Sequence, residues 1–316
     1  MLLRFVAERL AHMVVVMLLV ATLVFFIFRI LPGDPAQLVL GLEPSRASLE
    51  ALREQMGLNR PLIVQYADWL WRAIQGDLGQ SISQGNRSVA SLIFPAMWRT
   101  LELAGIALIV GLAISIPAGV TAARRAGTWV DQLVRLFALA GYSLPSYWLA
   151  VLLMLAFSHH WTLFPAGGYV APAEDLNRHL SHLVLPSITV GVVMSAVLTR
   201  FMRSGMLEVL RLDYVRTARA KGLRSITVVY RHALRNAMLP FVTVVGINFG
   251  ALIGGMVVTE QVFAWPGLGW LIIQSITVRS YSVVQGAVLI TAALFVAINL
   301  VVDILYALID PRVSYG

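Results

Sequence analysis

The sequence predicts an all-α, polytopic membrane protein that crosses the bilayer with six transmembrane helices. Hydrophobic residues make up 59% of its 316 residues, charged residues only 13%, and the mean hydropathy is +0.79. These values lie outside the range of soluble domains. Long apolar runs recur, and because only helices and closed barrels span membranes, each run of about 20 residues predicts one helix. The predicted spans are residues 10–30, 99–122, 134–158, 183–203, 240–262 and 284–308.

The first predicted span follows Arg4 and Arg9, an arrangement that also occurs in secretory signals. Its apolar run is too long for a signal, however, and no small-residue cleavage site follows at 30–35. We therefore interpret residues 10–30 as a retained span.

The segment between the first two spans, residues 31–97, is long enough to hold its own helices. Pro44 and Ser45 can start a helix that Gly57 ends, and Pro61 can start another that Gly76 ends. The segment is too small for an independent core. Its apolar side chains are therefore expected to pack on the mouth of the spans, namely Leu49, Leu52, Met56, Leu62, Ile63, Trp69, Leu70 and Trp71.

The distribution of arginine predicts the orientation in the membrane, because segments rich in Lys and Arg stay in the cytoplasm. Arginines precede the first span and follow the second, and nine basic residues lie between Arg200 and Arg235 against two acids. In residues 31–97 the two signs are nearly balanced. Both termini and residues 204–238 are therefore predicted to be cytoplasmic, and residues 31–97 to face outward.

A basic polar segment, residues 213–240, separates the fourth and fifth spans. Residues 210–221 favour a short helix, with Asp213 placed to satisfy early amide groups and Gly222 placed to end the helix in a left-handed conformation. A second helix can start at Ser225 and run into the fifth span. Arg216, Arg219, Lys221 and Arg224 would then project toward water or a partner. The alternative is a solvated basic face that only determines topology.

Several motifs resemble those of one family. Asp213 to Leu223, followed by His232-Ala-Leu-Arg-Asn-Ala and Pro240, resembles the signature of binding-protein-dependent ABC importer permeases of the dipeptide, oligopeptide and nickel class. Arg216 and Thr217 replace the Glu and first Ala of the general importer motif, as is typical of this subclass. The resemblance continues over essentially the whole chain. It includes Leu31-Pro-Gly-Asp-Pro, Leu58-Asn-Arg-Pro-Leu, Gly76-Asp-Leu-Gly-Gln-Ser, Ser143-Leu-Pro, Phe263-Ala-Trp-Pro-Gly-Leu-Gly and Asp310-Pro-Arg, whereas Arg279-Ser-Tyr-Ser departs from the usual Arg-Asp-Tyr-Pro.

The resemblance implies a function and a set of partners. It implies an ABC importer permease fold, formed by a single permease domain over 1–316, in the inner membrane of a bacterium. The permease would form half of a pathway for short peptides, with chelated nickel or glutathione as alternative cargoes. Its partners would be a second homologous permease, two ATPase subunits, an extracytoplasmic solute-binding protein and membrane lipid. The coupling helix that docks on the ATPase would comprise Asp213, Tyr214, Arg216, Thr217, Ala218, Arg219, Lys221, Gly222 and Leu223.

Other function classes find little support in the residues. The one lysine, Lys221, lies between Ala220 and Gly222, so the chain lacks a Walker loop and ATP would be hydrolysed in a partner. No hydrolase motif occurs, and the sequence indicates no cofactor. The net charge of +8 is concentrated beside apolar runs, which favours lipid contact over nucleic-acid binding. An ion-driven secondary transporter is the alternative class, but inverted repeats and interrupted spans are not evident.

Two further sets of polar residues are candidates for binding. Asn248, Asn299 and Asp303 lie within or near spans and are candidates for the transport pathway, with helix packing as the alternative role. His179 and His182 are one helical turn apart and could face one metal ion. We predict no metal site, because a histidine near the membrane surface does not require a ligand.

Overall fold

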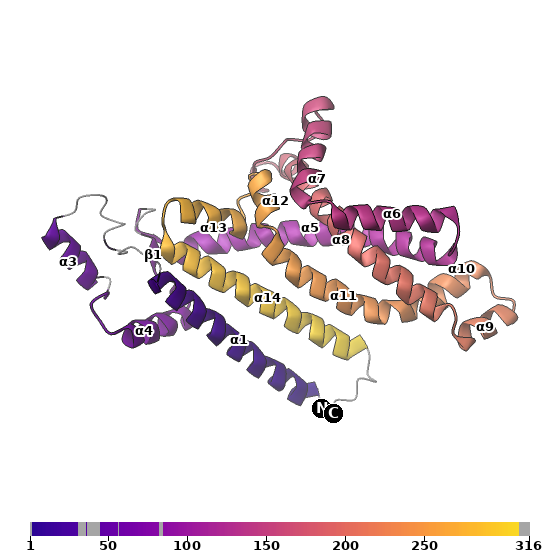
Figure 1. Ribbon diagram of the computed structural model, residues 1–316, viewed down its shortest axis with the longest axis horizontal. Helices are drawn as coiled ribbons and strands as arrows, with labels where there is room; N and C mark the ends of the chain where they lie inside the picture. The colour runs from indigo at the N-terminus through magenta and orange to yellow at the C-terminus, as the bar shows by residue number, and fades with distance from the viewer. Residues whose placement is uncertain (1, 31–35, 37–44, 56, 82–84, 310–316) are drawn as a thin grey trace. The chain divides into compact units, whose positions relative to one another are not determined.

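The computed structural model describes residues 2–30, 36, 45–55, 57–81 and 85–309, and it is almost entirely helical (Figure 1). One short antiparallel pair joins β1 (Gln80–Ser81) to β2 (Arg87–Ser88), with Gln80 opposite Ser88. The longer helices are α1 (Leu2–Ile30), α5 (Val89–Arg124), α8 (Leu176–Val209), α11 (Leu234–Gly255) and α14 (Tyr281–Ile309). The shorter ones are α3 (Arg46–Gln55), α4 (Leu62–Ile74), α6 (Trp129–Ser143), α7 (Ser146–Leu153), α9 (Asp213–Ala220), α10 (Ser225–Thr227), α12 (Val257–Val262) and α13 (Leu268–Thr277), with π-helical segments η2 (Met154–His160) and η3 (Val228–Ala233).

Four of the six predicted spans appear as single continuous helices, and a fifth, 240–262, is continuous as far as Gly255. Residues 7–30, 89–124, 176–209, 225–255 and 281–304 are each long and apolar enough to cross a membrane. The predicted third span is different, because residues 129–143 and 146–160 form two helices at 103° to each other. Six spans result when this bent pair is counted as one broken span.

The break in the third span has a local cause. Leu144 has an extended backbone, with φ −81° and ψ 128°, and it precedes Pro145. The proline ring disfavours the helical conformation in the residue before it. The expectation of one uninterrupted helix over 134–158 was therefore wrong.

The ends of the helices also differ from the predicted spans. The helix α8 extends the predicted fourth span at both ends, because polar residues continue the helix beyond the apolar run. In the fifth span, α11 stops at Gly255, and α12 follows as a separate short helix. Hydropathy indicates which residues suit the bilayer, but hydrogen bonding decides where a helix ends.

The chain divides into two compact units. The first comprises residues 1–6, 100–265 and 295–316, and the second comprises residues 7–99 and 266–294. The helices α1, α5 and α14 therefore each contribute residues to both units. A single permease domain over 1–316 stays a prediction.

In the second unit, α1, α4, α5, α13 and α14 contribute to a shared apolar core. Phe25 of α1 contacts Tyr66 and Trp69 of α4 with ring centroids 5.3 and 5.6 Å apart. The Ser81 and Ser280 hydroxyls form a buried hydrogen bond of 2.8 Å. The buried residues of this shared core are Ala21, Leu78, Val89, Ile93, Ala96, Leu268, Leu271, Val283, Ala287 and Leu289.

The outward segment follows the predicted helices only in part. The helices α3 and α4 form, and Gly57 and Gly76 adopt the expected left-handed φ of +67° and +82°. Of the apolar side chains expected to pack on the spans, Trp69 and Leu70 adjoin the core, and Leu49 is half-buried. Those of Leu52 and Met56 lie outside the described residues. The expectation was wrong for three others on α4, which are largely exposed: Leu62, Ile63 and Trp71.

In the first unit, α8 is the central helix, with α6 and α11 packed against it (Figure 1). Glycines allow α5 to approach α8 closely. A Cβ added at Gly119 would lie 2.7 Å from Met202, and one at Gly191 would lie 2.7 Å from Val110. Small residues at such crossings are a common means of packing helices in membranes. The apolar core of the first unit includes Leu198, Met202, Met206 and Phe241.

Candidate functional site

The helix α9, within the basic segment 213–240, begins later than predicted. Its N-cap residue is Leu212, which has an extended backbone, and no side chain caps the first turn. Asp213 is instead the first helical residue, with a side chain that is 96% exposed and 3.5 Å from the Arg216 guanidinium. The expectation that Asp213 caps the helix was wrong, because a capping side chain must precede the first helical residue. Its charge still favours the positive end of the helix.

The end of α9 agrees with the sequence prediction. Gly222 has φ +77°, in the left-handed region, and its N–H donates to the Arg219 carbonyl at 2.9 Å. The Leu223 N–H donates to the Ala218 carbonyl at 3.4 Å. This pair of bonds is a Schellman motif, which satisfies carbonyl groups that the last helical turn leaves unpaired. Gly222 therefore determines both where α9 stops and the direction in which the chain leaves it.

One face of α9 is fixed to the rest of the first unit. Val215 and Ala218 are buried in one apolar cluster with residues of α8 and η3. The others include Met206 and Val209 of α8 and Val228, Val229 and Ala233 of η3. The spacing of three residues puts Val215 and Ala218 on one face of the helix. Because η3 runs directly into α11, α9 is attached to the ends of two long helices.

A small polar cluster adds a second attachment. The Asn236 side-chain amide donates to the Tyr214 hydroxyl at 2.6 Å and lies 3.3 Å from the His232 carbonyl. The Tyr214 hydroxyl lies 3.4 Å from the same carbonyl. All three residues belong to the sequence motifs, but the motifs do not predict their contact, because the contact depends on the folding of α9 back onto η3 and α11.

The remaining face of α9 and the turn after it are exposed. Arg216, Thr217, Arg219 and Lys221 all lie at the surface. Exposed apolar side chains lie beside them in the sequence, at Leu223, Ile226 and Tyr230. We give the name α9 surface to the exposed residues of the segment 213–230. Arginine and tyrosine beside apolar side chains are enriched in protein interfaces, so this composition is suited to a protein partner.

Next to the α9 surface is a basic hollow of about 540 Å³. Arg124 and Arg125 reach it from the end of α5, Arg211 from the end of α8, and Arg219 from α9. None of the eleven described lining residues is acidic. Four like charges around one hollow attract anionic groups. The other lining residues are Thr121, Ala123, Ala126, Leu207, Leu210, Ser225 and Val229.

The pathway candidates contact their own helices. The Asn248 amide donates to the Val244 carbonyl at 2.8 Å, and the Asn299 amide donates to the Phe295 carbonyl at 3.0 Å. Asn299 also lies against Gly250, where an added Cβ would be 3.4 Å from its Oδ1. Asp303 is half-buried on α14. Asn299 therefore lies where α14 contacts α11. A pathway role for Asn248, Asn299 and Asp303 stays a prediction.

The two candidate metal-binding histidines have different surroundings. His179 is 1% exposed, with Nδ1 2.8 Å from the Val170 carbonyl and Nε2 2.8 Å from Glu102 Oε1. His182 Nδ1 lies 2.7 Å from the Arg178 carbonyl. A metal ion on His179 would have to displace a protein oxygen. Among the described residues, no group of three or more His, Cys, Asp or Glu side chains could hold a metal ion.

Sequence reasoning missed a buried ion pair between α6 and α8. The Arg203 guanidinium donates to both carboxylate oxygens of Asp131, at 2.6 and 2.8 Å, and the Gly127 N–H donates to the same carboxylate at 3.0 Å. Asp131 is 1% exposed. Asp131 is the one acidic residue between Glu102 and Glu174, and this isolation in the sequence was the available signal.

The sequence of this chain matches a known family of proteins. Residues 115–315 match the family described as binding-protein-dependent transport system inner membrane component, and residues 2–94 match the N-terminal region of such components. The chain belongs to this family. Its relatives include a putative peptide permease protein of Brucella suis, 40% identical over 99% of both chains. Others are a dipeptide transport system permease protein of Alkalihalophilus pseudofirmus, at 37% over 99% of this chain and 100% of the relative, and a glutathione transport system permease protein of Salmonella typhimurium, at 41% over 99% of both.

Solved structures support the permease fold independently. The inward-facing methionine transporter MetNI aligns with a TM-score of 0.56 at 19% identity, covering 69% of this chain and 96% of the transporter chain. Its family and its relatives show that the chain is a multi-pass inner-membrane permease component of an ABC importer. Permease components of this family act with a binding protein and an ATPase, and they do not hydrolyse ATP themselves.

Proposed function

We propose that this permease imports short peptides and receives the energy for transport through α9. The observation that carries the proposal is the construction of α9, which combines a buried anchoring face with an exposed basic face. The names of the relatives support a peptide substrate, because they include peptide and dipeptide permeases. The coupling residues are Asp213, Tyr214, Arg216, Thr217, Ala218, Arg219, Lys221, Gly222 and Leu223. Among them Ala218 is buried and anchors the helix.

The packing of α9 suggests how movement is transmitted. Val215 and Ala218 pack among residues of α8 and η3, and protein interiors are too densely packed to absorb a displacement locally. A shift of α9 by the ATPase would therefore move the ends of α8 and α11 together. The two spans would re-expose the pathway to the opposite side of the membrane, as alternating access requires.

The positive charge of the basic hollow suggests that the ATPase carries acidic side chains where it contacts α9. Arg124 and Arg125 lie on a different helix from Arg219, yet all three line one hollow beside α9. Acidic side chains of the ATPase seated there would steer docking and oppose a wrong register. The contact would thus involve the end of α5 as well as the segment 204–238.

The proposed assembly contains this chain, a second homologous permease, two ATPase subunits and an extracytoplasmic binding protein. The segment 204–238 and both termini face the cytoplasm, and the segment 31–97 faces outward. Residues 1–316 act as one permease domain. Asn248, Asn299 and Asp303 contribute polar groups to the spans near the pathway.

Glutathione is the second candidate substrate. A glutathione transport permease is 41% identical over 99% of both chains, as similar as the peptide permeases. Glutathione is itself a tripeptide derivative, so one pathway could suit both cargoes. Chelated nickel has less support, because His179 and His182 have protein hydrogen-bond partners.

Uptake measurements test the proposed substrate. Cells with and without this gene are compared for uptake of labelled di- to pentapeptides, glutathione and nickel. We expect peptide uptake to be lost on deletion and restored by the wild-type gene. Loss of nickel or glutathione uptake with peptide uptake intact would reject the peptide assignment. Peptide uptake that persists after ATP depletion, while the membrane potential is maintained, would instead favour a secondary transporter.

A further inference from the structure

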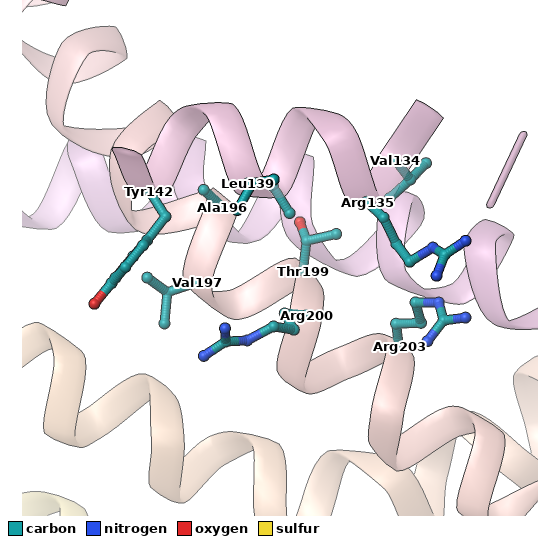
Figure 2. A pocket seen from close by; sticks show the side chains of 10 residues that line it. Val134, Arg135, Leu139, Tyr142, Ala196, Val197, Thr199, Arg200 and Arg203 are labelled. Carbon is teal, nitrogen blue, oxygen red and sulfur yellow. The ribbon is translucent and has the colours of Figure 1, made fainter. Parts of the chain in front are cut away.

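A groove of about 360 Å³ lies between α6 and α8 in the first unit (Figure 2). The Arg135 and Arg203 guanidinium groups lie near each other at one end, and Tyr142 lies at the other. None of the ten described lining residues is acidic, and most are apolar. The lining consists of Val134, Arg135, Ala138, Leu139, Tyr142, Ala196, Val197, Thr199, Arg200 and Arg203.

The three arginines of the groove are not fully neutralised. Arg203 is paired with Asp131 through two short hydrogen bonds. Arg135 lies 3.9 Å from the same carboxylate, and its side chain is 55% exposed. In the described part of the chain no carboxylate pairs with Arg200, whose guanidinium lies 5.9 Å from the Phe201 ring. Because unpaired charge beside the hydrocarbon is costly, the site favours an anion.

The groove has a direction relative to the rest of the first unit. The helix α6 begins shortly after Arg124, which lines the basic hollow with Arg219 of α9. Arg135 is therefore nearer to the α9 end than Tyr142, which lies seven residues, or roughly 10 Å, further along α6. Leu139 and Tyr142, which both line the groove, are exposed. The polar end at Arg135 and the apolar length along Ala138 and Leu139 match an amphiphile whose head lies toward α9. The Arg200 guanidinium extends beneath Val197, toward the Tyr142 end (Figure 2).

We propose that this groove binds an anionic phospholipid. The phosphate group lies at the Arg135 end of the groove, Arg200 adds positive charge farther along it, and one acyl chain lies along Ala138 and Leu139. Long arginine side chains reach from apolar surroundings to headgroups, and each attracts anionic lipid. The excess of positive charge favours a lipid over a second permease subunit, which would have to bury an acidic side chain there.

Lipid retention by the purified transporter tests the proposal without measuring transport. The probe is labelled phosphatidylglycerol, mixed with phosphatidylcholine in nanodiscs that hold the complex with this full chain. Arg135→Gln with Arg200→Gln is expected to lower retained phosphatidylglycerol by roughly tenfold or more, since each charge contributes to the attraction. Arg178→Gln, near the other end of α8, is the matched charge control and is expected to change nothing.

Two further variants separate charge from space and guard against misfolding. Arg135→Lys with Arg200→Lys keeps both charges and is expected to retain most of the lipid. Val197→Trp keeps all charges but fills the groove, and it is expected to lower retention about as much as the double Gln variant. Unchanged phosphatidylglycerol in both the Gln and Trp variants would overturn the proposal, as would an equal loss of phosphatidylcholine.

The chain has no cysteine, so the competing occupant can be tested directly. Leu139→Cys in the assembled complex is treated with a short thiol-to-amine cross-linker. Cross-linking to the second permease would show that protein covers the groove and would reject the lipid site. Absence of this cross-link, with specific retention of phosphatidylglycerol, is the expected result.

Discussion

Position 222 favours glycine because of its backbone conformation and not because a side chain would lack space. Its φ is +77°, and nothing lies within 4 Å of where a Cβ would be. A larger side chain would meet no clash, but an L-residue in the left-handed region costs about 1–2 kcal/mol. A β-branched residue is the least suited to it. The identity of residue 222 therefore acts on the exit angle of the chain and, through it, on the α9 surface.

We predict that Gly222→Val leaves insertion and assembly intact but lowers substrate-stimulated ATPase activity and uptake about tenfold, as a strain of ~1–2 kcal/mol on the exit turn allows. Reconstituted complexes with the binding protein provide both measurements. Gly222→Asn is the matched control, since asparagine tolerates this conformation, and it is expected to retain most activity. Full activity of the valine variant would mean that the turn after α9 has no part in coupling.

The local sequence predicts the conformation of some single residues but not their distant contacts. The left-handed Gly222 could be predicted because a glycine after a helical run is a local signal. The hydrogen bond between Tyr214 and Asn236 could not, because it joins residues 22 positions apart. The same holds for Asp213, where only the backbone conformation of Leu212 decides which residue begins α9.

At the scale of elements, α6 is held against α8 by the pair between Asp131 and Arg203. The pair is bidentate, and the Gly127 amide adds a third bond from the turn before α6. Charge-assisted bidentate bonds constrain direction as well as distance. The pair therefore sets the register of the short helix α6, which ends at the break before Pro145 and is too short to cross a membrane alone.

We predict that Asp131→Asn destabilises the protein, because it leaves Arg203 without its counter-charge. Breaking a buried pair in this way costs about 3–5 kcal/mol, which corresponds to a fall in Tm of roughly 6–10 °C. Thermal unfolding of the purified permease in detergent gives the measurement. The double variant Asp131→Asn with Arg203→Met removes both charges and is expected to recover part of the loss.

Arg135→Gln is the matched control for this prediction. It removes an exposed guanidinium 3.9 Å from the same carboxylate, an interaction worth less than about 1 kcal/mol. A fall in Tm as large as that of Asp131→Asn would contradict the view that Arg203 is the structural partner. An unchanged Tm in Asp131→Asn would show that the pair does not stabilise the helix contact.

At the scale of the whole molecule, the property to test is the orientation in the membrane. The Arg distribution predicts that α9 is cytoplasmic and that α4 is outside. Both regions offer exposed positions for chemical labelling, at Gln75 and Ser225. Ser81 is unsuitable because it is buried against Ser280.

We predict that Gln75→Cys reacts with a membrane-impermeant thiol reagent in intact cells and that Ser225→Cys reacts only after permeabilisation. The wild-type chain, which lacks cysteine, is the background control. Labelling of residue 225 but not 75 in intact cells would invert the proposed topology and place α9 out of reach of a cytoplasmic ATPase.

The sequence by itself determined the class of this protein, its number of spans and the position of α9. Apolar length, glycine at a helix end and the motif around Gly222 are local properties, and they remain readable without the fold. Only the tertiary structure decided that Asp131 pairs with Arg203 and that four arginines on or next to three helices line one hollow. These features depend on which distant residues meet, and a helix that satisfies its own backbone hydrogen bonds leaves that choice to side-chain packing.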